Sequence, residues 1–507
     1  MNLEREAADV RMDDDTDDDD TDADDIILHP FDEDTVHLLK NNDPIVAGLF
    51  IDGSDEWVEG ADIAIAKSKC LREIYILLKD GDLARLPHLW PGIGNNRSVE
   101  TLKLVGEGIE YASTDVEILM KGAVAALLED NDQLQCIEYD FGLSHEALCS
   151  ISTVLSNYSK NKLKQIHISN SCGFDQFEAE FFDSLKEIHS LIELSCTCFV
   201  LESMGCKALA NLLQNRASNI TTLTLEYTGI DDISITILSN AFIKNNEIGT
   251  RNRLSTLTIF GDISVTESGW RMLWAFLVHD ACQLENLHLI ETSVADDELI
   301  RLGAALSVNQ SVKHLDVSFS VYRGLTRGWA GFSTCLRSPR SVLVELNLSH
   351  CSISIDGMIE IMLALAENSR LAILDICYMH DDVRFSERFW QQVVTLLCDT
   401  TSINNTFLSN HILHTLKRYG YRDPPQPMVG SKEVVPLLQM NMNANKTEVA
   451  RQKILSSHFS RGVTNVQTFA NMQERMLPYA IEWIGRDNLG FSLMFSVVQF
   501  LLAVNRI

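Results

Sequence analysis

The chain has 507 residues, a hydrophobic fraction of 46% and a formal net charge of −30. The hydrophobic fraction is ordinary for a folded globular protein, whereas the acidic balance disfavours nucleic acid as a partner, because phosphate binding requires a basic surface. A basic protein is the natural complement of such a chain.

The first 25 residues form a strongly acidic segment. They contain 13 Asp and Glu against 2 Arg, so this segment contributes −11 of the net charge. We expect it to be disordered, because it has too few apolar side chains to offset its ordering entropy. It lacks the basic and apolar parts of a secretion signal, and the 12 Cys show no framework of paired spacings. Both features favour a cytoplasmic protein, with the nucleus as an alternative.

From Leu71 onwards the chain repeats one unit. Each unit opens with apolar residues at positions 1, 4 and 6, as at Leu254, Leu257 and Ile259, and continues into a helical run. About twelve units follow one another, mostly at steps of 28 to 31 residues, up to a weak triplet that starts at Ile403. The triplet predicts the inward face of a short strand, and the run predicts an amphipathic helix. One unit cannot bury its own apolar face, so the units must stack.

This pattern resembles the leucine-rich repeats of the ribonuclease-inhibitor type, over roughly Leu71 to Leu408. That family carries Asn or Cys at position 9, where the side chain ties a bend to the neighbouring coil. Here small residues stand at this position in six units: Ser171, Thr228, Asp262, Thr292, Ser320 and Cys351. Lys79, Glu107 and Phe199 depart from the pattern.

The resemblance implies an α/β solenoid with a parallel sheet on the concave side and helices on the convex side. Packing widths predict the same horseshoe, because strands lie about 4.8 Å apart whereas a helix with its side chains needs about 10 Å. Concave surfaces of this kind serve solenoid proteins to bind large partners.

The helical halves of four units are clear in the sequence. They are predicted at Met204–Leu213, Asp232–Ile243, Asp297–Val308 and Gly357–Glu367. An Asn follows each of them within two residues, at Asn215, Asn245, Asn309 and Asn368. Because Asn tolerates the left-handed conformation that often closes a helix, we expect these residues to adopt it.

The chain divides into five regions. They are a disordered acidic tail at 1–25, an N-terminal cap at 26–62, the solenoid at 63–416, a Pro-rich linker at 417–430 and a helical C-terminal module at 431–507. In the cap, Pro44–Ile51 is predicted to be a strand that begins the sheet. The apolar run Phe491–Val504 is too short to span a membrane, and it predicts a packing helix with interfacial membrane contact as an alternative.

The C-terminal module is predicted to be helical throughout. Its helices are expected at Glu433–Met440, Lys446–Phe459, Val466–Arg475 and Leu477–Ile484. Its run LLQMNMNANKTEVARQKIL and the later LPYAIEWIGRD resemble the C-terminal segment of leucine-rich-repeat families expanded in diatom-like algae. The resemblance implies a lineage and no particular activity.

Positions 3, 5 and 7 of each unit should face the open concave side, because strand side chains alternate. Lys103 is the one Lys or Arg among the residues that we assign there. The predicted partner-binding residues are Glu73, Tyr75, Glu138, Asp140, His167, Glu193, Glu226, Phe260, His288, His314, Asp316, Glu345 and Asp375. The acids would attract a basic partner, the aromatic residues would anchor it, and the three His would make binding sensitive to pH near about 6 to 7. The alternative is a concave face that is acidic only because it is solvated.

No catalytic, cofactor-binding or metal-binding motif stands out. The phosphate loop, the nucleophile elbow and the H-E-x-x-H motif are absent from the sequence. The pairs Cys196/Cys198 and His411/His414 lack the further ligands of a metal site. We therefore expect a non-catalytic scaffold that binds a basic protein and needs no cofactor or metal.

Other functions are compatible with the same sequence. The first alternative is a regulator of an enzyme, either a ribonuclease-type inhibitor or a GTPase-activating protein. The second is a substrate-recognition subunit of a ubiquitin ligase.

Overall fold

The computed structural model describes residues 26–52, 58–79, 88–107, 131, 133–140, 151–155, 162–170, 179–247, 253–280, 282–320, 326–377, 387–417 and 431–459, with positions 478, 479 and 482. Several predictions lie outside the described residues. These are the acidic tail at 1–25, Ser171, the linker from 418 to 430, the helices at Val466–Arg475 and Phe491–Val504, and most of Leu477–Ile484.

One parallel sheet extends from Leu28 to Lys417. It has 14 strands, and each strand pairs with the strands before and after it in the sequence. They are β1 (Leu28–Pro30), β2 (Gly48–Asp52), β3 (Glu73–Lys79), β4 (Thr101–Glu107), β5 (Cys136–Asp140), β6 (Gln165–Ser169), β7 (Glu193–Thr197), β8 (Thr222–Glu226), β9 (Thr256–Phe260), β10 (Asn286–Ile290), β11 (His314–Asp316), β12 (Glu345–Asn347), β13 (Ile373–Asp375) and β14 (Thr415–Lys417). The predicted cap strand at Pro44–Ile51 is observed as β2, which starts later, at Gly48, and the prediction that it begins the sheet is wrong, because β1 pairs with its outer edge.

Helices alternate with the strands and cover the outer side. The α-helices are α1 (Glu33–Lys40), α2 (Ala61–Lys67), α3 (Trp90–Asn95), α6 (Ala179–Ser184), α7 (Ser203–Gln214), α8 (Asp232–Glu247), α9 (Glu267–Val278), α10 (Asp296–Val308), α11 (Thr326–Phe332), α12 (Thr334–Arg337), α13 (Ile355–Glu367), α14 (Glu387–Leu397), α15 (Ile403–Leu408), α16 (Ser431–Asn441) and α17 (Lys446–Ile454). Two short irregular helices are η2 (Leu185–Glu187) and η3 (Leu455–Phe459).

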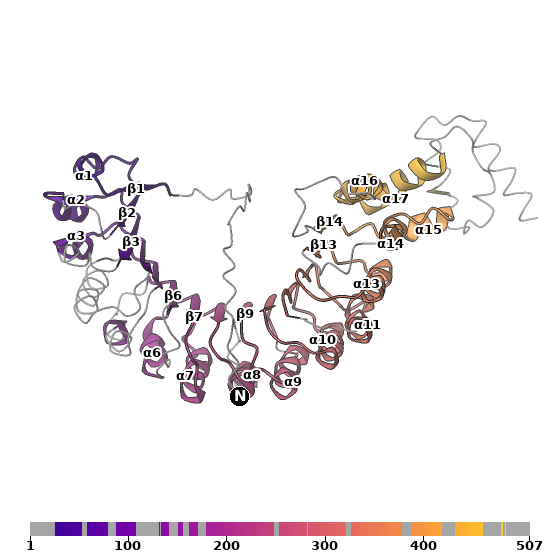
Figure 1. The fold of residues 1–507 in the computed structure, drawn as a ribbon, viewed down its shortest axis with the longest axis horizontal. Coiled ribbons are helices and arrows are strands. Elements are labelled where there is room, and N and C mark those ends of the chain that lie inside the picture. Colours follow the sequence, from indigo (N-terminus) through magenta and orange to yellow (C-terminus); the bar gives the residue numbers. More distant parts are fainter. Residues whose placement is uncertain are drawn as a thin grey trace, which may run out of the picture.

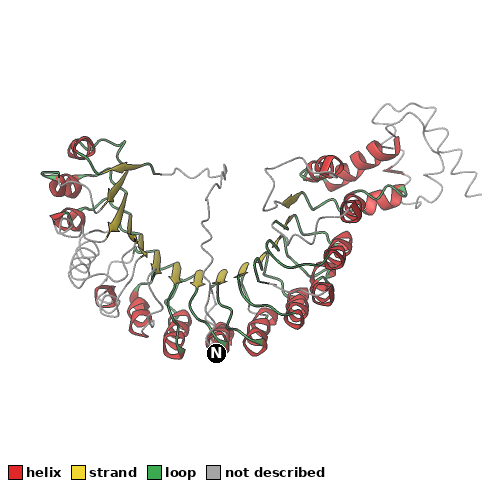
Figure 2. Cartoon of the chain, viewed as in Figure 1, coloured by secondary structure: helices red, strands yellow, loops and turns green. Residues whose placement is uncertain are grey.

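The chain is an open leucine-rich-repeat solenoid, as the sequence predicts. The elements follow a horseshoe (Figure 1), and the strands line its inner side while the helices form its outer side (Figure 2). The predicted apolar triplets point into the core: Leu254, Leu257 and Ile259 are each no more than 1% exposed. Buried side chains form one continuous cluster from Phe31 to Val434, so each coil is stabilised by its neighbours.

The last predicted triplet is wrong. Residues Ile403–Leu408 form helix α15, and the final strand β14 begins seven positions later, at Thr415. Ser402 caps this helix, because its side chain accepts a hydrogen bond from the backbone N–H of Asn405 at 3.1 Å. A short polar helix of this kind has no strand-like alternation of buried residues, which explains why the triplet is weak.

The prediction for the Asn residues at helix ends is also wrong. Asn215, Asn309 and Asn368 have φ values of −64°, −64° and −84° with extended backbone, and none of them is left-handed. Asn245 lies inside helix α8, which continues to Glu247. Asn215, Asn309 and Asn368 instead form hydrogen bonds between coils.

Asn side chains join successive coils at the helix ends. In each case Nδ2 donates to a backbone carbonyl of an earlier coil. The pairs are Asn96 to Ile65 at 2.6 Å, Asn131 to Val99 at 2.7 Å, Asn215 to Lys186 at 3.2 Å, Asn309 to Leu277 at 2.7 Å, Asn368 to Leu336 at 2.8 Å, Asn410 to Leu365 at 2.8 Å and Asn441 to Leu413 at 2.6 Å. We call this series the asparagine ladder. It provides a side-chain donor to backbone carbonyls at the junctions between coils.

A second series of hydrogen bonds joins the bends that follow the strands, at the predicted position 9. Thr228, Asp262, Thr292, Ser320 and Cys351 are all buried there. Thr228 Oγ1 donates to Asp262 Oδ2 at 3.0 Å, and Thr292 Oγ1 donates to Ser320 Oγ at 3.1 Å. The small polar residues of the degenerate pattern therefore link neighbouring coils, as the resemblance implies.

Asp262 is a buried carboxyl in this series, and its replacement tests a pH effect on stability. Burial raises the pKa of Asp262 to about 6, although hydrogen bonds from Thr228 and Ile230 oppose the rise. The folded chain therefore binds a proton between pH 3.8 and about 6 that the unfolded chain does not bind. The stability that this group contributes is present below pH 3.8 and is lost as pH rises through about 6.

We predict that Asp262→Asn stabilises the chain at pH 8 by roughly 1–3 kcal/mol, because a neutral amide accepts the same backbone hydrogen bond without a buried charge. The gain should shrink steadily as pH falls to 5. Urea denaturation at pH 5, 6.5 and 8 measures it. A difference between variant and wild type that is the same at all three pH values would contradict the prediction.

The C-terminal helices α16 and α17 pack on the last coils of the solenoid. Lys453 of α17 is fully buried there, and its Nζ donates to the carbonyls of Leu397 at 2.6 Å and Asn410 at 3.0 Å. The third acceptor is His411 Nδ1 at 3.2 Å. His411 Nε2 lies 3.0 Å from the Phe407 carbonyl and must donate to it, so Nδ1 is free to accept.

The Lys453 amine thus has three acceptors, which match the three N–H bonds of an ammonium group. Burial lowers the pKa of Lys453 to about 7. Burial, followed by the charge of Lys453, lowers the pKa of His411 to about 4, which keeps this imidazole neutral near pH 7. We call this arrangement the Lys453 socket.

Candidate interaction surface

Strand pairing arranges the concave side chains in rows. Neighbouring strands pair residue for residue, so equivalent positions lie side by side across the sheet. The middle row is Phe50, Tyr75, Lys103, Glu138, His167, Ser195, Thr224, Thr258, His288, Asp316, Asn347, Asp375 and Lys417. The thirteen predicted residues all lie in this row or in the two rows beside it, at partly exposed positions of their strands. Their role in binding stays a prediction.

The charge of this face differs from the sequence prediction in one respect. Lys417 of β14 stands beside Asp375 in the middle row, so Lys103 is not the one basic residue there. Sequence reasoning missed Lys417 because it placed the last strand at Ile403–Leu408.

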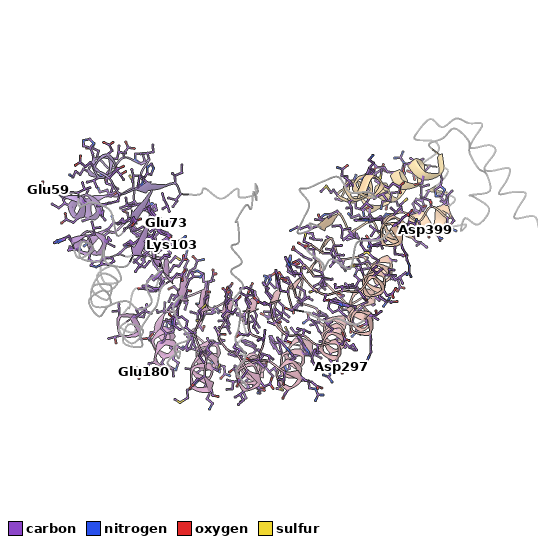
Figure 3. All side chains as sticks on the ribbon, viewed as in Figure 1. Glu59, Glu73, Lys103, Glu180, Asp297 and Asp399 are labelled. Atoms are coloured by element: carbon purple, nitrogen blue, oxygen red, sulfur yellow. The ribbon has the colours of Figure 1, made fainter. Side chains whose placement is uncertain are left out.

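Lys103 neutralises two of the predicted acids near the N-terminal end. Its Nζ lies 3.3 Å from Glu73 Oε1 and 3.8 Å from Glu138 Oε2. Figure 3 places Glu73 and Lys103 on the inner side of the horseshoe. Burial opposes the charged amine, but the two carboxylates outweigh it and raise the pKa of Lys103. Beside them the rings of Phe50 and Tyr75 stack with centroids 5.2 Å apart.

Glu193 is held by two polar neighbours on β6. Gln165 Nε2 donates to Glu193 Oε2 at 2.9 Å, and His167 Nε2 lies 3.9 Å from Glu193 Oε1. These contacts orient the carboxylate along the sheet, so it is less available to a partner than the sequence alone suggests.

The C-terminal half of the face has a similar internal pairing. His314 Nδ1 lies 3.0 Å from Glu345 Oε2, and Asn347 Nδ2 donates to Asp316 Oδ2 at 2.8 Å. His288 lies among these residues. Burial lowers the pKa of His288, although the charge of Asp316 opposes the change. Its titration therefore lies below the pH range that its ordinary pKa predicts.

Three carboxylates near the centre of the face lack a cationic partner. Among the residues that the structure describes, Asp140, Glu226 and Glu291 form no ion pair with Lys or Arg. Burial raises the pKa of Glu226; the hydrogen bond from Thr197 opposes this rise and the charge of Asp140 adds to it. The negative charge of these three carboxylates is therefore not compensated by Lys or Arg among the described residues.

Sequence reasoning missed Glu291 and Tyr227, which directly follow strands β10 and β8. Tyr227 donates its hydroxyl to Glu291 Oε2 at 2.7 Å, across the intervening coil. Gly261 makes this possible, since a Cβ there would lie 2.2 Å from Tyr227 Cδ1 and Cε1. The available signal was a large residue at position 8 of several units, just beyond the strand positions that we assigned.

Other kinds of site find little support in the described part of the chain. No three His, Cys, Asp or Glu side chains gather there in an arrangement suited to a metal ion. None of the helices in the described ranges is long and apolar enough to cross a membrane.

Comparison with known proteins gives partial relatives. No protein-family model matches the chain. It is 23% identical over 350 residues to mouse NACHT, LRR and PYD domains-containing protein 4E, which covers 67% of this chain and 33% of that protein. It is 31% identical over 173 residues to human NACHT, LRR and PYD domains-containing protein 13, which covers 34% of this chain and 16% of that protein.

The chain therefore spans about a third or less of the length of these relatives. Among solved structures, leiomodin-1 actin-binding site 2 aligns with a TM-score of 0.24 and 18% identity, over 32% of this chain and 83% of that one. The names of the two NACHT, LRR and PYD relatives include leucine-rich repeats, which agrees with the leucine-rich-repeat solenoid of this chain.

Proposed function

We propose that this chain is a non-catalytic interaction module that binds a basic protein on the concave face of its sheet. The observation that carries the proposal is the uncompensated negative charge of that face. Asp140, Glu226, Glu291 and Asp375 form no ion pair with Lys or Arg among the described residues. A large open sheet with this charge complements a basic partner.

The likeness to NACHT, LRR and PYD proteins supports the interaction role, because these relatives are named for leucine-rich repeats, and solenoids of such repeats bind large partners on their concave surfaces. The alternatives of a ribonuclease-type inhibitor and a GTPase-activating protein would use the same fold. No observation on the described residues favours either of them over a scaffold.

A pair of charge-matched variants tests the proposal. The concave variant carries Asp140→Asn, Glu226→Gln, Asp316→Asn and Asp375→Asn. The control variant carries Glu180→Gln, Glu187→Gln, Asp280→Asn and Glu367→Gln, which are exposed positions in or beside the outer helices. Both variants change the net charge by the same amount, so they differ only in the side of the solenoid that loses negative charge. The substitutions are isosteric and each retains one oxygen acceptor, although Asp316→Asn loses the acceptor of either the Ser318 N–H or Asn347 Nδ2.

Partners captured by the wild-type chain are identified by mass spectrometry, purified and titrated by calorimetry at low and high salt. We expect the concave variant to weaken binding by about tenfold or more and to flatten its salt dependence, while the control binds like the wild type. Equal losses in both variants would indicate a general charge effect. A partner that binds all three chains equally would refute the proposal.

A further inference from the structure

A row of residues follows the strands at the edge of the concave face. In six consecutive coils the residue at position 8 has a positive φ: Cys198 at 60°, Tyr227 at 49°, Gly261 at 73°, Glu291 at 52°, Phe319 at 55° and His350 at 56°. We call these six residues the rim. Residues other than glycine rarely adopt this conformation, so its recurrence in five non-glycine residues marks the same bend after each of these strands.

Two aromatic pairs include rim residues. The rings of Tyr227 and Phe260 have centroids 5.0 Å apart and are tilted by 57°. The rings of Phe319 and His350 stack at 3.7 Å with an angle of 14°. Phe319 is 36% exposed, which is high for a large aromatic residue next to a sheet. Exposed aromatic faces of this kind are suited to binding.

Each pair lies near carboxylates. Glu226 directly precedes Tyr227 in the chain and pairs with Phe260 across the sheet, and Glu291 accepts the Tyr227 hydroxyl. At the second pair, the backbone N–H of His350 donates to the Cys377 carbonyl at 2.9 Å, and the Cys377 N–H donates to Asp375 Oδ1 at 2.9 Å, which places this carboxylate near His350. Among the described residues none of these three carboxylates is in an ion pair with Lys or Arg. Aromatic faces next to unpaired carboxylates are the surroundings that a guanidinium group prefers.

The spacing of the two pairs defines the length of a matching ligand. The first pair spans β8 and β9 and the second spans the coils of β11 and β12, so their centres are three strand spacings apart. At about 4.8 Å per spacing this is roughly 14 Å. Four residues of an extended chain cover about 13 Å, and side chains at positions i and i+4 point to the same side.

We propose that the rim docks an extended segment of a protein partner that carries two arginines four residues apart. One guanidinium lies on the Tyr227–Phe260 pair beside Glu226, and the other lies on the Phe319–His350 pair beside Asp375. This inference rests on the proposed function. It further specifies that the partner binds at the rim and that arginine is the side chain recognised. Arginine is preferred to lysine because its planar group stacks on rings and forms two hydrogen bonds to a carboxylate.

Fluorescence polarisation with short peptides on the full chain tests the inference. The peptides have a glycine–serine background with two arginines at i and i+4, two lysines at i and i+4, or two arginines at i and i+1. We expect the first peptide to bind at least about fivefold to tenfold more tightly than either of the others, in keeping with the strength of cation–π contacts. Equal binding of the three peptides, or no binding of the first, would overturn it.

Three variants of the chain complete the experiment. Tyr227→Leu and Phe319→Leu remove one aromatic ring each. Each should lower the affinity for the peptide with arginines at i and i+4 by about fivefold or more. Phe50→Leu is the matched control, since Phe50 stacks with Tyr75 away from the rim, and it should leave binding unchanged. Circular dichroism and the melting temperature verify that each variant is folded.

The outcomes separate this inference from the function on which it rests. If the concave charge variant loses its protein partner while Tyr227→Leu and Phe319→Leu bind the peptide like Phe50→Leu, the rim inference fails and the proposed function stands. The opposite result is that binding of the arginine peptide is lost in the rim variants while the purified partner binds the concave variant as tightly as the wild type. In that case the proposed function fails and the rim inference stands.

Discussion

Replacing Asn309 with alanine is expected to lower the free energy of unfolding by about 3 kcal/mol or more, since each buried backbone group left without a partner costs about 1–3 kcal/mol. Asn309 is 5% exposed. Its Nδ2 donates to the Leu277 carbonyl at 2.7 Å, and its Oδ1 accepts from the N–H groups of Ser311 at 2.9 Å and Val312 at 2.8 Å. The substitution leaves three backbone groups of two coils without these partners.

Urea denaturation followed by tryptophan fluorescence measures the change in unfolding free energy. Trp270 and Trp274 lie in α9, the helix whose C-terminal end the Asn309 amide contacts, so they report on this junction. Asn286→Ala is the matched control, because its Nδ2 makes one hydrogen bond, to Thr256 Oγ1 at 2.9 Å, on the partly exposed concave face. The control should cost less than about 1 kcal/mol. An equal loss of unfolding free energy in the two variants would show that this residue of the asparagine ladder stabilises the chain no more than one hydrogen bond on the concave face does.

Replacing Lys453 with alanine should detach the C-terminal helices from the solenoid. The substitution leaves the carbonyls of Leu397 and Asn410 without their ammonium donor and opens a cavity in a fully buried site. Removing one partner of a buried charged interaction costs about 3–5 kcal/mol. In a solenoid each coil is stabilised mainly by its neighbours, so the loss should remain local to α16 and α17. Hydrogen exchange of residues 431–454 should therefore rise while exchange of β9 and β10 stays unchanged.

Lys432→Ala is the control for the Lys453 socket. Lys432 is an exposed lysine of α16, so its removal changes the charge of the same helices without opening the core. It should leave exchange of α17 close to that of the wild-type chain. If Lys453→Ala and Lys432→Ala give the same exchange pattern, α17 does not depend on the buried amine, and the socket is not what holds the C-terminal helices.

The repeat made much of the architecture predictable. Position 1, 4 and 6 triplets such as Leu254, Leu257 and Ile259 are buried because a short strand packs alternate side chains against helices. The predicted helix at Asp297–Val308 differs from the observed α10 by one residue at its start. Patterns of this kind are local to one unit, and the same strand and helix recur in each unit that stacks along the chain.

Sequence predictions were wrong where one residue type can serve two structural purposes. Asn at the end of a helix predicted a left-handed cap, yet Asn309 is extended and binds the previous coil. The choice depends on whether a neighbouring carbonyl lies within reach, which the spacing of one unit does not reveal. The triplet at Ile403 failed for a related reason, because Ser402 caps a helix there and excludes a strand.

The candidate surface was predictable in position but not in charge. Sequence alternation places Glu73, Glu138 and Asp140 on the same concave face. The structure pairs the first two with Lys103 and leaves Asp140 without such a partner among the described residues. Ion pairs across strands depend on register between residues about 30 positions apart, so the sequence of one unit is silent about them.

The sequence by itself determined the solenoid, its curvature and the side of the sheet that is open, because each of these follows from periodicity and packing widths within a single repeat. Tertiary structure decided which carboxylates remain uncompensated, that Tyr227 reaches Glu291 over Gly261, and that Lys453 is buried against the last coil. The physical reason is the separation along the chain of the residues that interact. Hydrophobic alternation acts between near neighbours in the chain, whereas charge pairing and buried hydrogen bonds act between coils whose contacts only stacking creates.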